Sequence, residues 1–241
     1  MDNNRFPKDF FWGTATSSYQ IEGAPDLDGK GPSVWDSFSH KEGNIKNGDT
    51  GDIACDHYHL WPKDLELLEN LGVDSYRFSI SWPRILPSGK ETKPNQKGLD
   101  FYSRLIDNLL EKNITPFITL NHWDIPQGLE DEGGWTERMM VDAFVEYSYH
   151  TSKHLGDRVR HWITHNEPWC VSHIGYVAGH KPPGLKNKWA KSLSAAHHLL
   201  LSHGMAIPEI RNNVENANVG ITLNLNTAIP ASPSEQDKKA G

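Results

Sequence analysis

The chain has 241 residues, 37% of them hydrophobic and 23% charged, which is typical of a globular protein with one large domain or two small ones. Its formal net charge of −7 argues against binding to nucleic acid or to anionic membranes, because both reward a basic patch. No apolar run approaches the roughly 20 residues of a membrane-spanning helix, and the N-terminus lacks the apolar segment of a signal peptide. Cys55 and Cys170 are too few for a disulfide framework, so we expect free thiols and a cytoplasmic protein.

Strands and helices are predicted to alternate along the chain. Short apolar, aromatic and β-branched stretches predict strands at residues 10–15, 75–80, 115–120, 161–166 and 219–225. Helical patterns lie between them at residues 60–71, 99–112, from an N-cap at Thr136 to about Leu155, and at residues 189–212. Pro208 lies inside the last helical pattern and is predicted to kink or break it. Residues 234–241 indicate the start of a further helix.

This alternation implies an α/β fold with parallel strands and right-handed crossovers. A doubly wound sheet and a (β/α)8 barrel both begin this way. The barrel is favoured because no Gly-x-Gly-x-x-Gly follows the first strand and because polar residues follow several successive strands. A complete barrel typically takes about 250 residues, yet long segments such as 18–73 leave room for five strands only. We therefore predict that residues 1–241 are the N-terminal part of a single TIM-barrel domain, with strands six to eight absent.

The most informative segment is Thr-His-Asn-Glu-Pro-Trp at residues 164–169. Pro168 has no N–H for a sheet ladder and is expected to hold Glu167 extended, so the strand ends there. Glu167 then lies at the carboxyl end of a strand, where barrel enzymes keep their chemistry. Asn166 and Glu167 would point to opposite faces of a regular strand. Both can enter one site only if the strand end is distorted.

Arg77 is predicted to point into the barrel. The period of two places Tyr76, Phe78 and Ile80 on the face that meets the helices, and Arg77 on the other face. An arginine there needs a carboxylate partner. It is either an active-site residue that orients a carboxylate or part of a structural ion pair.

Polar residues also follow other predicted strands. His122 could hydrogen-bond a sugar hydroxyl beside the aromatic platform of Trp123, and Gln20 offers an amide that both donates and accepts. Taken alone, His122 is more often a structural histidine and Gln20 a loop residue. Their combination favours a functional site, because Gln20, His122 and Glu167 all follow strand ends on the same rim of the barrel. Neither His57 with His59 nor His197 with His198 has the spacing and third ligand of a zinc site, and we predict no metal or cofactor.

Four motifs in order resemble glycoside hydrolase family 1, the β-glucosidase family. They are residues 6–24, Arg-Phe-Ser-Ile-Ser-Trp at 77–82, His-Trp-Asp at 122–124 and Asn-Glu-Pro at 166–168. The resemblance implies a retaining β-glycosidase that hydrolyses terminal β-D-glucosyl residues of a β-glucoside or a short β-linked oligosaccharide. It makes Glu167 the catalytic acid/base and Arg77 the arginine beside the nucleophile. Gln20, His122 and Asn166 match residues that bind the sugar, and we add Trp123 to that substrate-binding set.

The main departure concerns the nucleophile. In the family it lies in a Thr-Glu-Asn-Gly type motif after strand seven, and this sequence has no such motif. Retaining chemistry needs two carboxyls about 5–5.5 Å apart, and Glu22, Asp56 and Asp124 do not match the nucleophile position. A smaller departure is Gly-His-Lys-Pro-Pro-Gly at residues 179–184, where the family more often has Ala before a single Pro-Gly.

We therefore expect activity only together with a C-terminal portion, whether a second polypeptide, a proteolytic product or a segment outside this sequence. Other readings stay open. The chain could be an inactive fragment or a sugar-binding pseudo-enzyme. A complete enzyme could also prefer another substrate, as a β-galactosidase or a 6-phospho-β-glycosidase does. Thioglucosidase action fits less well, because those relatives commonly carry glutamine where this chain has Glu167.

Overall fold

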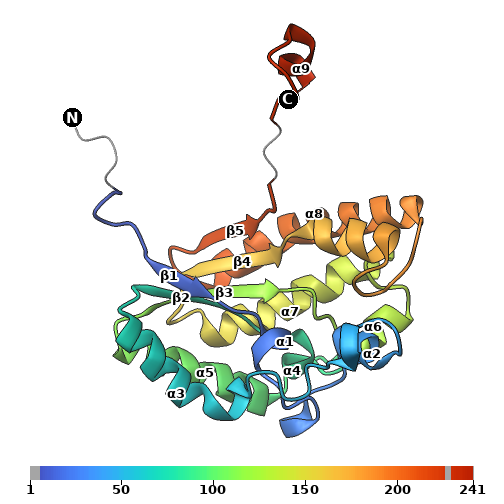
Figure 1. Ribbon diagram of the computed structural model, residues 1–241. Coiled ribbons are helices and arrows are strands. Elements are labelled where there is room, and N and C mark those ends of the chain that lie inside the picture. Colours follow the sequence, from blue (N-terminus) through green and yellow to red (C-terminus); the bar gives the residue numbers. More distant parts are fainter. Residues whose placement is uncertain (1–5, 226–228, 241) are drawn as a thin grey trace, which may run out of the picture.

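A computed structural model describes residues 6–225 and 229–240 of the chain. Five parallel strands form one sheet in which each strand pairs with the strand before it in sequence (Figure 1). They are β1 (Gly13–Ala15), β2 (Ser75–Ser79), β3 (Thr115–Asn121), β4 (His161–Asn166) and β5 (Asn218–Thr222). A doubly wound sheet reverses its strand order at a switch point, whereas a barrel adds strands in sequence. The observed order is that of the first five strands of a barrel.

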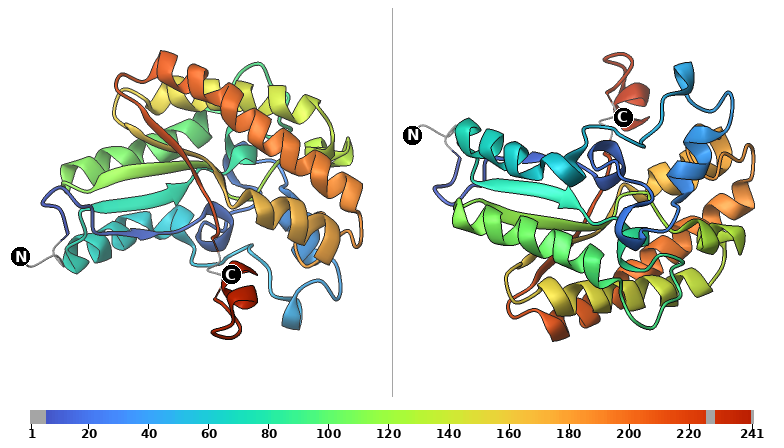
Figure 2. Two further views of the ribbon diagram at one scale, coloured as in Figure 1. Left: turned by 90° about the horizontal axis from the view of Figure 1, so that it is seen from above. Right: turned by 90° about the horizontal axis from the view of Figure 1, so that it is seen from below.

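Helices connect the strands. The described helices are α1 (Ser18–Ile21), η1 (Leu27–Gly29), α2 (Val34–His40), η2 (Lys46–Gly48), α3 (His57–Leu71), α4 (Trp82–Ile85), α5 (Gln96–Glu111), α6 (Gln127–Asp131), η3 (Gly134–Thr136), α7 (Met139–Leu155), the π-helical η4 (Cys170–Ala178), α8 (Trp189–Asn213) and α9 (Glu235–Ala240). Helices α3, α5, α7 and α8 follow one another around the outside of the sheet, and α9 stands apart from it (Figures 1 and 2). Within the two described ranges, no helix is both long and apolar enough to cross a bilayer.

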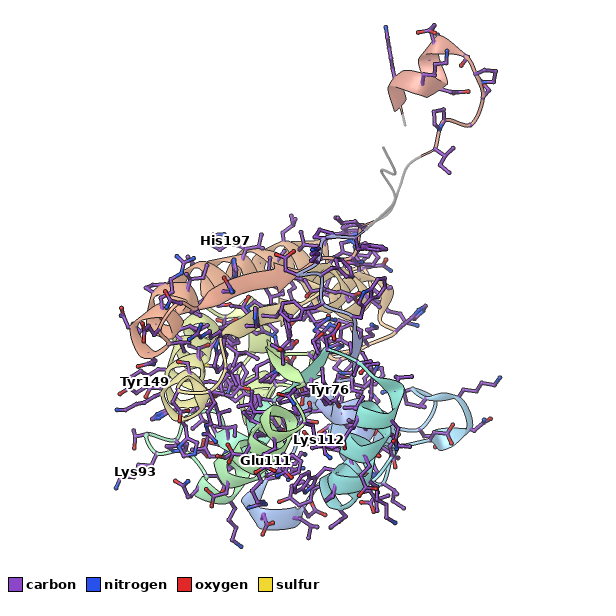
Figure 3. The ribbon with its side chains drawn as sticks, turned by 90° about the vertical axis from the view of Figure 1, so that its left-hand side faces the viewer. Tyr76, Lys93, Glu111, Lys112, Tyr149 and His197 are labelled. Atoms are coloured by element: carbon purple, nitrogen blue, oxygen red, sulfur yellow. The ribbon has the colours of Figure 1, made fainter. Side chains whose placement is uncertain are left out.

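The two faces of β2 differ as the sequence predicts. Tyr76 and Phe78 are buried, and Phe78 stacks on Tyr102 of α5 with 6.5 Å between ring centroids. Figure 3 shows Tyr76 among the packed side chains, whereas His197 lies on the outer surface of α8. Arg77, on the opposite face, is only half-buried. The hydrophobic core therefore lies between the sheet and the helices, and the polar face of β2 points to the barrel interior.

The start of α7 differs from the prediction. The helix begins at Met139 with Arg138 at the N-cap position, and no side chain caps it. Thr136 lies earlier, in η3, and its hydroxyl donates a hydrogen bond to the carbonyl of Gly133 at 2.7 Å. Thr136 thus belongs to the 3-10 turn, and α7 begins three residues later with no side chain accepting from its first amides. The prediction of an N-cap at Thr136 was wrong.

Pro208 does not break α8, which runs as one helix from Trp189 to Asn213. The hydrogen bond that Pro208 cannot donate would end on the carbonyl of Gly204. Both residues are exposed, so water can satisfy that carbonyl and the helix continues. Two strand limits also differ. β1 begins three residues later than expected, and β5 runs from Asn218 to Thr222 rather than over residues 219–225.

Candidate active site

The end of β4 is distorted, as the sequence requires if Asn166 and Glu167 are to share a site. The pairing of β4 with β5 shifts register between Ile163 and Asn166. Thr164 and His165 both contact α8, because Thr164 Oγ1 lies 2.7 Å from His203 Nδ1 and His165 Nε2 lies 2.9 Å from Ser202 Oγ. Two successive side chains thus face the helices, and the irregularity returns Asn166 to the interior face.

Glu167 has a left-handed backbone conformation, with φ at 49°. The expectation that Pro168 holds it extended was therefore wrong. Its N–H donates to the carbonyl of Thr222 at 2.8 Å, and its own carbonyl accepts from the N–H of Cys170 at 2.8 Å. These bonds tie the residue both to the end of β5 and to the start of η4. They outweigh the local preference that a following proline imposes. This conformation costs a non-glycine residue free energy, which these two bonds offset.

Arg77, Asn166 and His122 form a hydrogen-bonded chain at the strand ends. Arg77 Nη2 donates to Asn166 Oδ1 at 2.7 Å, and Asn166 Nδ2 lies 3.2 Å from His122 Nε2. Because a guanidinium can only donate, it fixes the amide so that Nδ2 donates to the imidazole. Burial, with the charges of Arg77 and Lys181, lowers the pKa of His122 to about 3. The ring is therefore neutral and carries its proton on Nδ1, which is buried without a partner among the described residues.

The partner predicted for Arg77 differs from the one observed. Arg77 Nε donates to Thr119 Oγ1 at 2.8 Å, and the other contact is the Asn166 amide, so neither partner is a carboxylate. Burial lowers the pKa of Arg77, and the charge of Glu167 acts in the opposite direction. Within the described ranges Glu167 is the only carboxylate with such an effect on Arg77. Among the described residues, Arg77 does not form the structural ion pair considered for it.

Trp123 and Gln20 join the same site. The indole N–H of Trp123 donates to the carbonyl of Asn166 at 2.8 Å. Gln20, His122 and Trp123 together line a cavity of about 310 Å³ beside the β1–α1 connection. The structure thus brings all six candidate residues to one rim of the sheet. The grouping follows from the parallel topology, since all strand ends of one polarity meet there.

Sequence reasoning assigned no chemical role to three side chains near Glu167. The Cys170 thiol donates to Glu167 Oε2 at 3.2 Å, and burial together with this bond raises the pKa of Cys170 to about 11. His165 is buried and supports the rim by accepting from Asn121 Nδ2 at 3.1 Å. Lys181 places its ammonium 3.2 Å from the ring centroid of Trp123. The spacing of Cys170 from Glu167, at the start of a helix, was the one local signal for these contacts.

The other carboxylates considered in the sequence have partners of their own. Glu22 accepts from Arg84 Nε at 3.2 Å, and Asp56 Oδ1 lies 2.6 Å from His59 Nδ1. Asp124 accepts from the Ser18 hydroxyl at 2.6 Å and is buried. Within the described ranges, none of the three is hydrogen-bonded to the Arg77–Asn166–His122 chain.

Asp124 is expected to make stability depend on pH. Burial raises its pKa to about 8, although the bond from Ser18 acts the other way. The folded state therefore holds a proton that the unfolded chain, with an ordinary value near 3.9, releases earlier. The stabilisation is complete below about pH 4 and is lost as pH rises toward 8. Asp124→Asn keeps the acceptor for Ser18 and should remove this slope. Urea unfolding of the unmodified chain and of Asp124→Asn at pH 5 and pH 8 measures how the free energy of unfolding depends on pH. An equal dependence in both proteins would contradict the prediction.

Consecutive parallel strands with polar side chains beyond their carboxyl ends define the class of (β/α)8-barrel proteins. The model of glycosyl hydrolase family 1 matches residues 2–241, and the chain belongs to this family.

The relatives of this chain include β-glucosidases. The β-glucosidase A of Thermotoga maritima is 52% identical over 100% of this chain and 53% of its own length. The β-glucosidase A of Acetivibrio thermocellus is 54% identical over the same shares. The structure of the Thermotoga maritima β-glucosidase in complex with deoxynojirimycin superimposes with a TM-score of 0.94 at 52% identity, covering 98% of this chain and 53% of that one. The chain thus spans about half the length of the relatives it matches.

Proposed function

We propose that this chain supplies the acid/base half of a retaining β-glucosidase, acting on terminal β-D-glucosyl residues. The observation that carries the proposal is the hydrogen-bonded chain of Arg77, Asn166 and His122 beside Glu167 on the rim of the sheet. The β-glucosidases related to this chain support the same reaction. The other residues have complementary roles, with Gln20 and Trp123 lining the adjoining cavity for the sugar.

In this mechanism Glu167 gives its proton to the leaving oxygen and later takes one from water. The neutral His122 lines the sugar cavity, and its Nε2 accepts from Asn166 Nδ2, which fixes both side chains beside Glu167. Arg77 holds Asn166 in the orientation that points its amide nitrogen away from the guanidinium. Arg77 also provides a positive charge that would orient a second carboxylate.

That second carboxylate, the nucleophile, is proposed to come from the strands that complete the barrel. Retention requires it about 5–5.5 Å from Glu167. The edge strands β1 and β5 each have a single neighbour in the sheet. Next to β5, Leu223 and Leu225 are 52% and 84% exposed. Unpaired strands and exposed leucines support association with a C-terminal portion, on the same longer polypeptide or on another. The free thiols Cys55 and Cys170 support a cytoplasmic location.

Complementation tests the proposal. The purified chain is assayed with 4-nitrophenyl β-D-glucoside alone, and again after co-expression with the C-terminal segment of the Thermotoga maritima β-glucosidase. We expect no turnover by the chain alone and turnover by the pair. Turnover by the monomeric chain alone would contradict the proposal that the active site is divided between this chain and a C-terminal portion. Sugar binding by an intact but inactive pair would instead favour a sugar-binding pseudo-enzyme. Parallel assays with the β-galactoside and the 6-phospho-β-glucoside decide the sugar preference.

A further inference from the structure

Lys181 occupies a defined position beside the candidate site. Its ammonium lies over the ring of Trp123, whose indole N–H is bound to the carbonyl of Asn166. Lys181 also lines a small cavity together with Trp35, Trp123 and Cys170. Trp123 thus links Lys181 to the residues beside Glu167. The sequence places this lysine in the segment that departs from the usual family pattern, at residues 179–184.

The backbone around Lys181 is held in place by η4. The N–H of Leu185 donates to the carbonyl of Gly175 at 2.9 Å, and the N–H of Asn187 donates to the carbonyl of Val177 at 3.0 Å. The carbonyl of Lys181 itself accepts from the N–H of Gly184 at 2.7 Å. Because η4 begins directly after Glu167-Pro168-Trp169, the same element positions both the carboxylate and the lysine.

No carboxylate of the described residues is bound to the ammonium of Lys181. Within the described part of the chain Lys181 makes no ion pair, in contrast to Lys30, Lys90, Lys97 and Lys112. Burial lowers the pKa of Lys181, whereas the nearby groups of Cys170 and Glu167 act in the opposite direction. The ammonium is therefore partly removed from water, with an aromatic ring as its observed partner. It shares the small cavity with Cys170, whose thiol is bound to Glu167. A cation in this state gains more from an added anion than one exposed to solvent.

The leaving group of a glucoside must lie against Glu167, because Glu167 gives its proton to the glycosidic oxygen. We propose that Lys181 determines aglycone specificity by selecting leaving groups that carry a carboxylate. This inference rests on the proposed function, since an aglycone exists only for a glycosidase. Lys181 donates a charge-assisted hydrogen bond to the aglycone carboxylate while its ammonium stays over the ring of Trp123. Cationic leaving groups are disfavoured by the same charge.

The test compares two substrates of similar size and similar leaving-group acidity, 4-carboxyphenyl and 4-carbamoylphenyl β-D-glucoside, with the completed barrel. We expect kcat/KM to favour the carboxylate about tenfold or more, as a charge-assisted hydrogen bond provides. Lys181→Met should bring the ratio close to one, and Lys181→Arg should keep most of it. Lys186→Met is the matched control, because it removes the same charge from an exposed position on the same segment. A ratio unchanged by Lys181→Met, or lowered equally by Lys186→Met, would overturn the proposal.

A binding experiment separates this inference from the proposed function. The chain is titrated with 4-hydroxybenzoate and with 4-hydroxybenzamide while its tryptophan fluorescence is recorded. We expect tighter binding of the benzoate, with the difference lost in Lys181→Met and retained in Lys186→Met. If the completed barrel hydrolyses no glucoside, the proposed function fails, and this titration then decides only whether Lys181 selects ligands that carry a carboxylate. Equal binding of both compounds by the unmodified chain would then overturn it.

Discussion

Replacing Glu167 by glutamine is expected to lower kcat/KM of the completed barrel by about 10²- to 10⁴-fold for glucosides with poor leaving groups, the range that general acid–base catalysis contributes. Glutamine has the same size and keeps an oxygen that can accept from the Cys170 thiol, so the fold should be unaffected. It cannot give a proton to the leaving oxygen. It also cannot take one from water, so the second step of the reaction is slowed as well.

The dependence on the leaving group makes this prediction specific. A 2,4-dinitrophenolate leaves without a proton, so the first step should be nearly normal and the covalent intermediate should accumulate as a burst. Azide needs no base to attack that intermediate and should restore turnover. Glu132→Gln is the control, because Glu132 is an exposed glutamate paired with Lys90 and should give normal kinetics. Equal losses for both kinds of leaving group would contradict the assignment of Glu167 as acid/base.

The strands could be predicted, as could the side of β2 on which each side chain lies, because both depend on local patterns. An apolar side chain at every second position is enough to place Tyr76 and Phe78 on the helices. Predictions failed where a distant contact overrode a local preference. Pro168 biases Glu167 toward an extended conformation, yet the bond from Glu167 to Thr222 of β5 holds it left-handed. Thr136 has the chemistry of an N-cap, but it lies in a 3-10 turn and α7 begins three residues later.

In the candidate site, too, the features that follow from local patterns or topology could be predicted, and those that depend on distant packing could not. The parallel topology explains why residues after successive strands, such as Gln20 and His122, line one cavity. The need for a distorted strand end at Asn166 also followed from simple alternation, and the register shift of β4 confirms it. The position of Lys181 over Trp123 depends instead on how the segment after η4 packs against a loop from β3. No periodic pattern encodes such a contact.

Removing Arg84 is expected to destabilise the chain by about 3–5 kcal/mol, the cost of leaving one member of a buried ion pair without its partner. Arg84 of α4 is fully buried, and Glu22, just after α1, is 4% exposed. Arg84 Nε donates to Glu22 Oε2 at 3.2 Å, and the Tyr102 hydroxyl of α5 donates to Glu22 Oε1 at 2.6 Å. In Arg84→Met the Glu22 carboxylate stays buried, and its remaining partner is the neutral hydroxyl of Tyr102.

Urea unfolding of four proteins measures the coupling: the unmodified chain, Arg84→Met, Glu22→Gln and the double variant. The double variant should be more stable than Arg84→Met, because it no longer buries an unpaired charge. Lys97→Met is the control, since Lys97 forms an exposed pair with Asp28 and its loss should change the stability little. A loss in Arg84→Met as small as this control would refute the argument. Gln20 lies in α1, shortly before Glu22 of the ion pair. The same variants should therefore also weaken sugar binding in the completed barrel.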